Sequence, residues 1–156
     1  INEAKAALRA SQEVHKPAYV SFTIRDDLSN KLRSGENLRR AIEELSYKNP
    51  NGILINCSSP ESISKAMPVM TGLSIPFGAY GNGFKSIAPL KPGSTVETLS
   101  ERKDLSPRAY SEFALEWIGL GATIIGGCCE IGPKHISFLF KKLKEEGYII
   151  AALPVN

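Results

Sequence analysis

The chain has 156 residues, 42% of them hydrophobic and 22% charged, and 19 Lys and Arg against 16 Asp and Glu give a formal net charge of +3. This is enough for one globular core, so we expect a single domain over residues 1–156. The basic excess is dispersed and no apolar stretch reaches the ~18 residues of a membrane span, which argues against a nucleic-acid-binding or membrane protein. Three cysteines, an odd number, favour a reducing compartment and a cytoplasmic location.

Helical and extended patterns alternate along the chain. Apolar residues at helical spacing alternate with short runs of β-branched and aromatic residues, and turn residues separate them. Helices are predicted at residues 3–14, 36–47, 59–72, 106–121 and from 132 onwards, and strands at 18–24, 53–56, 75–80 and 122–125.

Local signals predict where several elements begin or bend. Ser59-Pro60 and Ser106-Pro107 are typical of a helix N-cap followed by proline in the first turn. Pro68 should distort the third helix. The polar residues 85–105 are expected to form an extended connection, and the apolar tail 148–153 either packs across the last helix or adds an edge strand.

Strands separated by helices imply an α/β fold with a parallel sheet and right-handed crossovers. In such folds functional groups gather where the strands end. Cys57 follows the second strand, and Cys128 follows the fourth through Gly126 and Gly127. The cysteines are therefore predicted to meet at one edge of the sheet.

Gly126-Gly127-Cys128-Cys129 is the most informative stretch. Neighbouring residues of a strand point to opposite faces, so both sulfurs reach one ion only if the backbone leaves the extended conformation, and the glycines supply that freedom. Three thiolates favour Zn²⁺, and three protein ligands with an open fourth position are typical of a catalytic zinc site.

Other interpretations of the cysteines remain open at this point. Free cysteines are common as small buried hydrophobic residues, and a strained disulfide between Cys128 and Cys129 would leave Cys57 without a role. His135 and His15 are expected to pack or to face solvent rather than to bind metal.

Four segments resemble the homocysteine S-methyltransferase family. They are the stretch from Trp117 to Ile136 with its Gly-Gly-Cys-Cys motif, the strand Gly52–Ser58, the strand end Ser21–Asp26, and Tyr80–Gly83. The resemblance implies an eight-stranded (β/α) barrel, of which this chain matches the C-terminal half, strands five to eight with their helices. The N-terminal half, with its Asp-Gly-Ala-Met/Thr-Glu type segment, is not matched.

The resemblance also implies an activity. Zinc held by Cys57, Cys128 and Cys129 would bind the thiol of homocysteine, which receives a methyl group from a donor such as S-methylmethionine or S-adenosylmethionine to give methionine. The half alone is expected to be inactive until an N-terminal half-barrel or a second copy completes it. The alternatives are an inactive zinc-binding half-barrel that serves as an assembly or interaction module, and a fortuitous thiol cluster.

Polar residues and glycines around the cysteines are candidates for further roles. Asn82 serves equally well as a left-handed turn residue. Glu130 is expected to cap the last helix, and the charged stretch 25–27 is expected to be solvated rather than to order a loop. The predicted substrate contacts are Asn56, Ser58, Asn82, Gly126 and Gly127.

Overall fold

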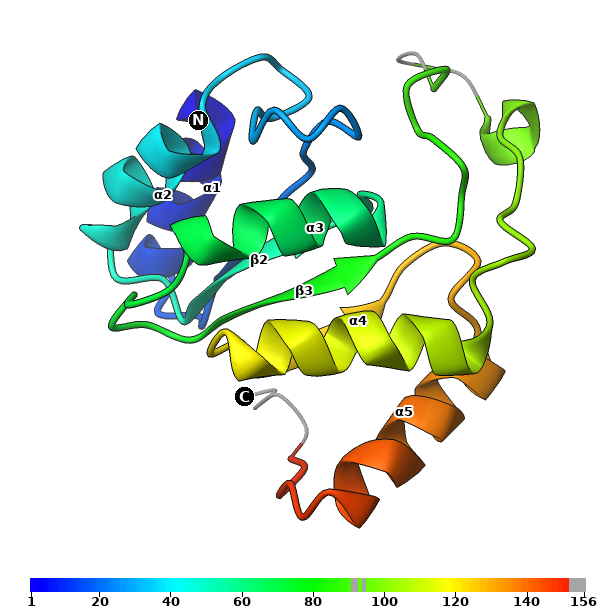
Figure 1. Ribbon diagram of the computed structural model, residues 1–156. Coiled ribbons are helices and arrows are strands. Elements are labelled where there is room, and N and C mark those ends of the chain that lie inside the picture. The colour runs from blue at the N-terminus through cyan, green and yellow to red at the C-terminus, as the bar shows by residue number, and fades with distance from the viewer. Residues whose placement is uncertain (91–92, 94, 152–156) are drawn as a thin grey trace.

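Four parallel strands alternate with helices in the computed structural model, which describes residues 1–90, 93 and 95–151 (Figure 1). This confirms the predicted α/β class and the predicted order. The elements are α1 (Asn2–Glu13), β1 (Tyr19–Phe22), α2 (Leu38–Ser46), β2 (Gly52–Asn56), α3 (Pro60–Ala66), the 3-10 helix η1 (Met67–Val69), β3 (Phe77–Gly81), the 3-10 helix η2 (Val96–Thr98), α4 (Pro107–Gly119), β4 (Ile124–Gly127) and α5 (Pro133–Glu145).

The sheet has the strand order β1-β2-β3-β4, and every neighbouring pair is parallel. All four strands therefore end at the same edge. In register, Asn56 of β2 lies beside Tyr80 of β3, which in turn lies beside Gly126 of β4. The residues that follow β2 and β4 consequently flank the end of β3, and these include the cysteines.

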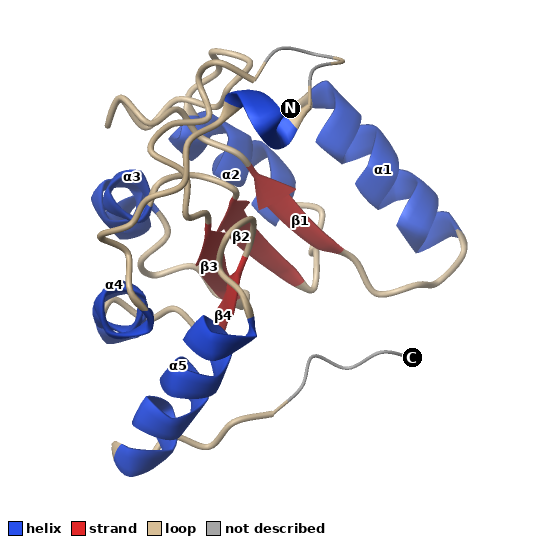
Figure 2. Cartoon of the chain, turned by 90° about the vertical axis from the view of Figure 1, so that its right-hand side faces the viewer, coloured by secondary structure: helices blue, strands red, loops and turns tan. Residues whose placement is uncertain are grey.

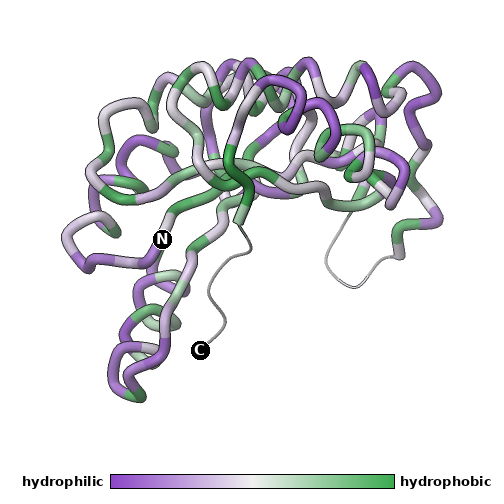
Figure 3. The backbone as a smooth tube through the Cα atoms, turned by 90° about the horizontal axis from the view of Figure 1, so that it is seen from below, coloured by the Kyte–Doolittle hydropathy of each residue, from purple (hydrophilic) through white to green (hydrophobic). Residues whose placement is uncertain are grey.

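One face of the sheet packs against the helices. Ile53, Ile55 and Ala79 alternate along the strands with no exposed area, and they belong to the core formed with the apolar sides of the helices. In Figure 2, α3 and α4 run side by side along this face. Figure 3 shows apolar segments concentrated along the strands and hydrophilic residues along the outer helices and loops.

The opposite face carries a different set of side chains. Ser21, Leu54, Asn56 and Tyr80 alternate with the core residues, and the Tyr80 hydroxyl reaches across β2 to donate to Ser21 Oγ at 2.7 Å. Among the described residues, β1 and β4 each pair along one side only. A sheet with helices on one face and two open edges has the arrangement of part of a barrel wall.

The predicted helix signals operate as expected. The Ser59 hydroxyl accepts the backbone N–H of Ser62, and Ser106 caps α4 in the same way. Proline occupies the start of both helices. Pro68 ends the regular part of the third helix, because the chain continues beyond Ala66 as the 3-10 helix η1. No helix in the described ranges combines the length and apolarity needed to cross a bilayer.

The strand limits differ from the prediction by one or two residues at several places. β1 ends at Phe22, because Ile24 turns away to form an antiparallel bridge with Leu32. β3 begins two residues late, at Phe77. β4 runs on to Gly127, so the glycines predicted to follow the strand form its last two residues.

Two connections were only partly predicted. The connection between β3 and α4 contains η2 and a bridge between Phe84 and Glu101, so it is not simply extended. Residues 148–151 form no strand; they line a groove of about 610 Å³ with Leu143 of α5 and with the start of β4. The last residues of the predicted tail, 152 and 153, lie outside the described residues.

Candidate metal centre

Cys57 directly follows β2 in a left-handed backbone conformation, with φ at 46°. Its N–H donates to the carbonyl oxygen of Tyr80 at 3.1 Å, which extends the pairing between β2 and β3 by one residue. A non-glycine residue in this region of φ is uncommon and is maintained by the contacts around it. The strained backbone therefore lies at the residue that the sequence marks as a metal ligand.

Cys128 and Cys129 form the turn that follows β4. The N–H of Cys128 donates to the carbonyl oxygen of Gly81 at 2.9 Å, and its own carbonyl accepts the N–H of Ile131 at 3.1 Å. Glu130 closes this turn in a left-handed conformation, with φ at 64°. As predicted, the backbone leaves the extended conformation at the cysteine pair.

The sulfur atoms of Cys57, Cys128 and Cys129 all lie within 4.8 Å of one another. The Sγ atoms of Cys128 and Cys129 are 3.8 Å apart, and all three thiols are free. A tetrahedral ion with ~2.3 Å bonds to sulfur requires its ligands to be about 3.8 Å apart, whereas a disulfide requires about 2.05 Å. The three sulfurs thus fit a shared metal ion, and the disulfide interpretation does not describe this structure.

The electrostatics of the cluster also favour a cation. Burial, together with the adjacent Cys128 and Cys129, raises the pKa of the Cys57 thiol to about 12. Burial and the neighbouring Cys128 raise the pKa of Cys129. Three thiolates cannot form side by side in a half-buried site without a positive charge among them, and a bound divalent cation supplies it.

Gly127, the second of the two glycines before the cysteines, has a different role from the one predicted. Neither Gly126 nor Gly127 has a positive φ, so the backbone freedom of glycine is not used here. A Cβ atom on Gly127 would instead lie 2.3 Å from Cγ2 of Ile131. Glycine is required there because the chain after the cysteines folds back onto the end of β4.

Tyr110 of α4 holds the ends of β3 and β4 together, a role that the sequence did not reveal. Its hydroxyl donates to the carbonyl oxygen of Gly126 at 2.6 Å and accepts the N–H of Gly81 at 3.0 Å. The side chain is fully buried, and burial raises the pKa of the hydroxyl, which therefore stays protonated. The tyrosine fits the apolar stripe of α4, so only the contact across space identifies the hydroxyl as a link between the strands.

We expect Tyr110→Phe to lower the free energy of unfolding by about 1–3 kcal/mol, because it removes the hydroxyl partner of a buried N–H and of a partly buried carbonyl. Urea unfolding measures this effect. Tyr47→Phe is the matched control: 86% of Tyr47 is exposed, and the variant should unfold like the wild type. A loss below about 0.5 kcal/mol for Tyr110→Phe would show that the bridge is dispensable.

The polar residues predicted to contact substrate differ in how deeply they are buried. Ser58 has no exposed area, and its hydroxyl accepts the N–H of Ile24 and donates to the Asn56 carbonyl, which joins the ends of β1 and β2. Asn56 is half-buried and accepts a hydrogen bond from Thr23. Substrate contact by these residues and by the two glycines remains a prediction.

Asn82 lies immediately after β3 and is almost completely buried. Its φ is not positive, so the left-handed turn interpretation is wrong. Its side-chain oxygen accepts the N–H of Phe84 at 2.9 Å, which shapes the turn from within. Its amide nitrogen has no partner among the described residues, so one donor of this buried side chain remains available.

The two histidines and Glu130 do not take part in the cysteine cluster. Nε2 of His135 lies 3.0 Å from the Leu105 carbonyl oxygen and the ring packs against Tyr110, so this histidine is a helix-packing residue, whereas His15 is exposed. Glu130 does not cap α5: the N-cap is Gly132, with no side-chain hydrogen bond.

Asp26 orders the loops at the strand ends and is not simply solvated. One carboxylate oxygen accepts the N–H of Ser59, and the other accepts the N–H of Ile87 and the hydroxyl of Ser86. Its exposed neighbours, Arg25 and Asp27, match the solvated expectation.

The fold and the site together define the class of protein to which this chain belongs. Four parallel strands with outer helices and three cysteines at the carboxyl edge make this chain one half of a TIM-type (β/α) barrel with a thiol cluster. A family model described as homocysteine S-methyltransferase matches residues 1–143. The chain belongs to the homocysteine S-methyltransferase family.

Curated relatives and solved structures agree with this membership. Homocysteine S-methyltransferase 1 of Arabidopsis thaliana is 28% identical over 151 residues, covering 91% of this chain and 43% of that protein. Homocysteine S-methyltransferase 2 of Saccharomyces cerevisiae is 30% identical over 164 residues, covering 93% of this chain and 45% of that protein. The metallated form of the homocysteine methyltransferase MmuM from Escherichia coli superposes with a TM-score of 0.67 at 24% identity, covering 90% of this chain and 41% of that one. The apo form of the same enzyme superposes with a TM-score of 0.65 at 25% identity, covering 90% of this chain and 45% of that one. The chain thus spans less than half the length of these relatives.

Proposed function

We propose that this chain is the zinc-binding half of an enzyme that transfers a methyl group to the thiol of homocysteine and so forms methionine. The observation that carries the proposal is the convergence of Cys57, Cys128 and Cys129 within 4.8 Å at the carboxyl edge of a half-barrel. Membership of the homocysteine S-methyltransferase family supports the reaction. Free thiols of this kind fit a reducing, cytoplasmic compartment.

Zn²⁺ suits these residues better than harder ions do, because all three side chains offer sulfur. When bound, zinc would supply a fourth coordination position for an external thiol and keep that thiol ionised at neutral pH. The three thiolates carry one more negative charge than the ion neutralises, so the sulfur of the substrate stays electron-rich. The half-buried position of the cysteines limits competition from water.

The residues around the cysteines would orient homocysteine. Asn56 and the backbone of Gly126 and Gly127 lie at the same edge, partly exposed, and we propose them as direct contacts. Ser58 and Asn82 are fully or almost fully buried, so they would act mainly by holding the strand ends. S-methylmethionine or S-adenosylmethionine would provide the methyl group.

A complementary half-barrel would complete the site. The open sides of β1 and β4 and the exposed apolar residues Ile136, Phe138 and Phe140 on α5 are surfaces that an N-terminal half would cover. We propose that an N-terminal half, in the same protein or in a separate chain, completes the barrel. We prefer it to a second copy of this chain, because the relatives are more than twice as long as their matched segment. These surfaces also support the second candidate function, a zinc-binding assembly module without turnover.

Methyl transfer by the reassembled barrel tests this proposal. Methionine is measured by mass spectrometry after the zinc-loaded chain is incubated with homocysteine and either methyl donor, with and without the N-terminal half of a family member. We expect no product from the chain alone and product from the mixture, with no product when Cys128→Ser replaces the wild type. Product from the chain alone would contradict the proposal that this chain carries only half of the active site. A stable, zinc-loaded mixture without turnover would favour the assembly module.

A further inference from the structure

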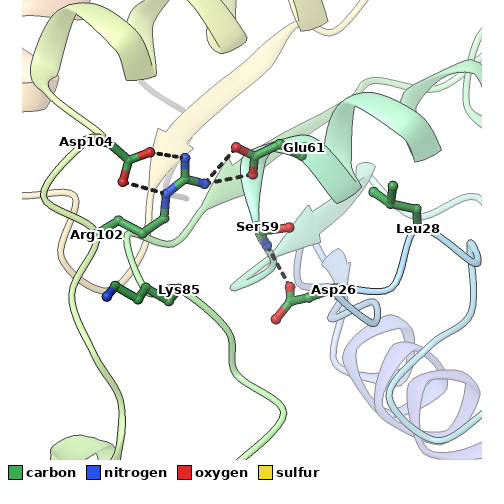
Figure 4. Close-up of a pocket in the computed structure, with 7 residues that line it drawn as sticks. All are labelled: Asp26, Leu28, Ser59, Glu61, Lys85, Arg102 and Asp104. Carbon is green, nitrogen blue, oxygen red and sulfur yellow. Dashed lines mark hydrogen bonds and ion pairs between the residues drawn. The ribbon is translucent and has the colours of Figure 1, made fainter.

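Arg102 anchors the connection between β3 and α4. Figure 4 shows its guanidinium group between two carboxylates. One nitrogen lies 2.7 and 2.8 Å from the two oxygens of Glu61, and another lies 2.7 Å from Asp104. Only 15% of the Arg102 side chain is exposed, against 82% for Arg9 and Arg108 in the ion pairs along single helices. The guanidinium group itself is shielded, whereas 45% of the Glu61 side chain and 70% of the Asp104 side chain are exposed. A guanidinium group held by several hydrogen bonds to two carboxylates fixes geometry more strongly than a single exposed ion pair does.

The backbone of Arg102 is linked to the turn that carries Cys129. Its N–H donates to the carbonyl oxygen of Gly83 at 2.7 Å, and the N–H of Gly83 donates to the carbonyl oxygen of Cys129 at 2.8 Å. The contact at Gly83 is close, since a Cβ atom there would lie 2.8 Å from Cβ of Glu130. A displacement of Arg102 would therefore be transmitted to the cysteine turn through one intervening residue.

The side chain of Arg102 is linked to the segment that carries Cys57. Glu61 lies in the first turn of α3, and the helix is capped by Ser59, two residues after Cys57. This segment has little freedom, because Cys57 is held in the left-handed region and the carbonyl oxygen of Ser58 accepts the N–H of Asn82. The ion pair with Glu61 thus fixes the start of α3 relative to the connection after β3.

We propose that Arg102 is a positioning residue of the metal centre, which sets the spacing between Cys57 on one side and Cys128 and Cys129 on the other. This inference rests on the proposed metal site. Arg102 does not reach the ion; it joins the two segments that supply the ligands, through its side chain in one direction and its backbone in the other.

Metal affinity and ligand geometry test the role of Arg102. Zinc affinity is measured by competition with a chelator under reducing conditions, and the absorption spectrum of the Co²⁺-loaded protein reports the geometry of the sulfur ligands. Arg102→Met should bind zinc about tenfold more weakly than the wild type, and its Co²⁺ spectrum should change. A loss of this size is typical when a residue that orients the ligands from outside the coordination sphere is replaced. Arg108→Met, which removes an exposed arginine from α4, should match the wild type in both.

The two carboxylates separate positioning from general stability. Glu61→Gln removes the charge and one of the two acceptor oxygens from the link toward Cys57, whereas Asp104→Asn weakens only a local pair in the same way. Glu61→Gln should therefore weaken zinc binding and Asp104→Asn should not. Melting temperatures of the metal-free proteins record the structural cost of each change. Equal zinc affinity in the two variants, or losses that simply follow the melting temperatures, would overturn the inference.

The outcomes also separate this inference from the proposed function. If the wild type binds no zinc, the proposed metal site fails and the inference fails with it. If the wild type binds zinc and Arg102→Met binds it equally well, only the inference fails. Should Arg102→Met not fold, the comparison of Glu61→Gln with Asp104→Asn decides the question.

Discussion

Gly78→Ala is expected to destabilise the chain by more than about 3 kcal/mol, above the usual range for a single added methyl group. Gly78 lies in β3 beside Ile124 of β4. A Cβ atom at residue 78 would lie 1.7 Å from the carbonyl oxygen of Ile124 and 2.6 Å from its carbonyl carbon. Both atoms belong to the backbone, so no side-chain rotation relieves the overlap and β4 must move as a whole. Urea unfolding of the metal-free protein measures the loss.

Gly119→Ala is the matched control for this substitution. Gly119 ends α4 without a positive φ, and a Cβ atom there would meet nothing within 4 Å. Alanine is favoured over glycine in a helix by up to ~1 kcal/mol, so the control should be neutral or slightly stabilised. A Gly78→Ala protein with wild-type stability would show that β3 and β4 do not pair as described. Because β4 leads into Cys128, we also expect Gly78→Ala to bind zinc weakly.

Removing any one cysteine is expected to lower zinc affinity by about 10²–10³-fold. A structural zinc site with four ligands is worth ~10–16 kcal/mol, so each thiolate contributes roughly 3–4 kcal/mol. Cys57→Ala removes the ligand that follows β2, and Cys128→Ser removes one that follows β4. Both should show the loss, because the two segments are held on opposite sides of the end of β3.

Chelator competition under reducing conditions measures this loss, together with the zinc content of the purified proteins. The sequence contains three cysteines, all in the cluster, so no matched cysteine elsewhere can serve as a control. The melting temperature of each metal-free variant provides that control, because it reports misfolding independently of zinc. Wild-type zinc content in a folded Cys57→Ala protein would limit the site to two ligands and would contradict the proposed centre.

The features that could be predicted from the sequence are those with a local cause. β-branched runs separated by helical stripes predict a parallel sheet, and a parallel sheet brings its strand ends together. Cys57 and the cysteine pair therefore had to meet at one edge, although 70 residues lie between Cys57 and Cys128. Ser-Pro pairs mark helix starts in the same local way, since the cap and the proline act within one turn.

The features that could not be predicted depend on contacts across space. The need for glycine at residue 127 comes from Ile131, which folds back onto it, and no local rule separates this cause from backbone freedom. Tyr110 occupies an ordinary core position of its helix, so its hydroxyl gains a role only where β3 and β4 end beside it. Arg102 lies in a connection that has few sequence signals of its own.

X-ray absorption at the zinc edge tests the central claim most directly, because it counts the sulfur atoms bound to the ion. For the zinc-loaded wild-type chain we predict three sulfur atoms at ~2.3 Å and one lighter atom. On addition of homocysteine, we predict that the lighter atom is replaced by a fourth sulfur. Fewer than three sulfur atoms in the free protein, or a spectrum that homocysteine leaves unchanged, would contradict a three-cysteine centre that binds the substrate thiol.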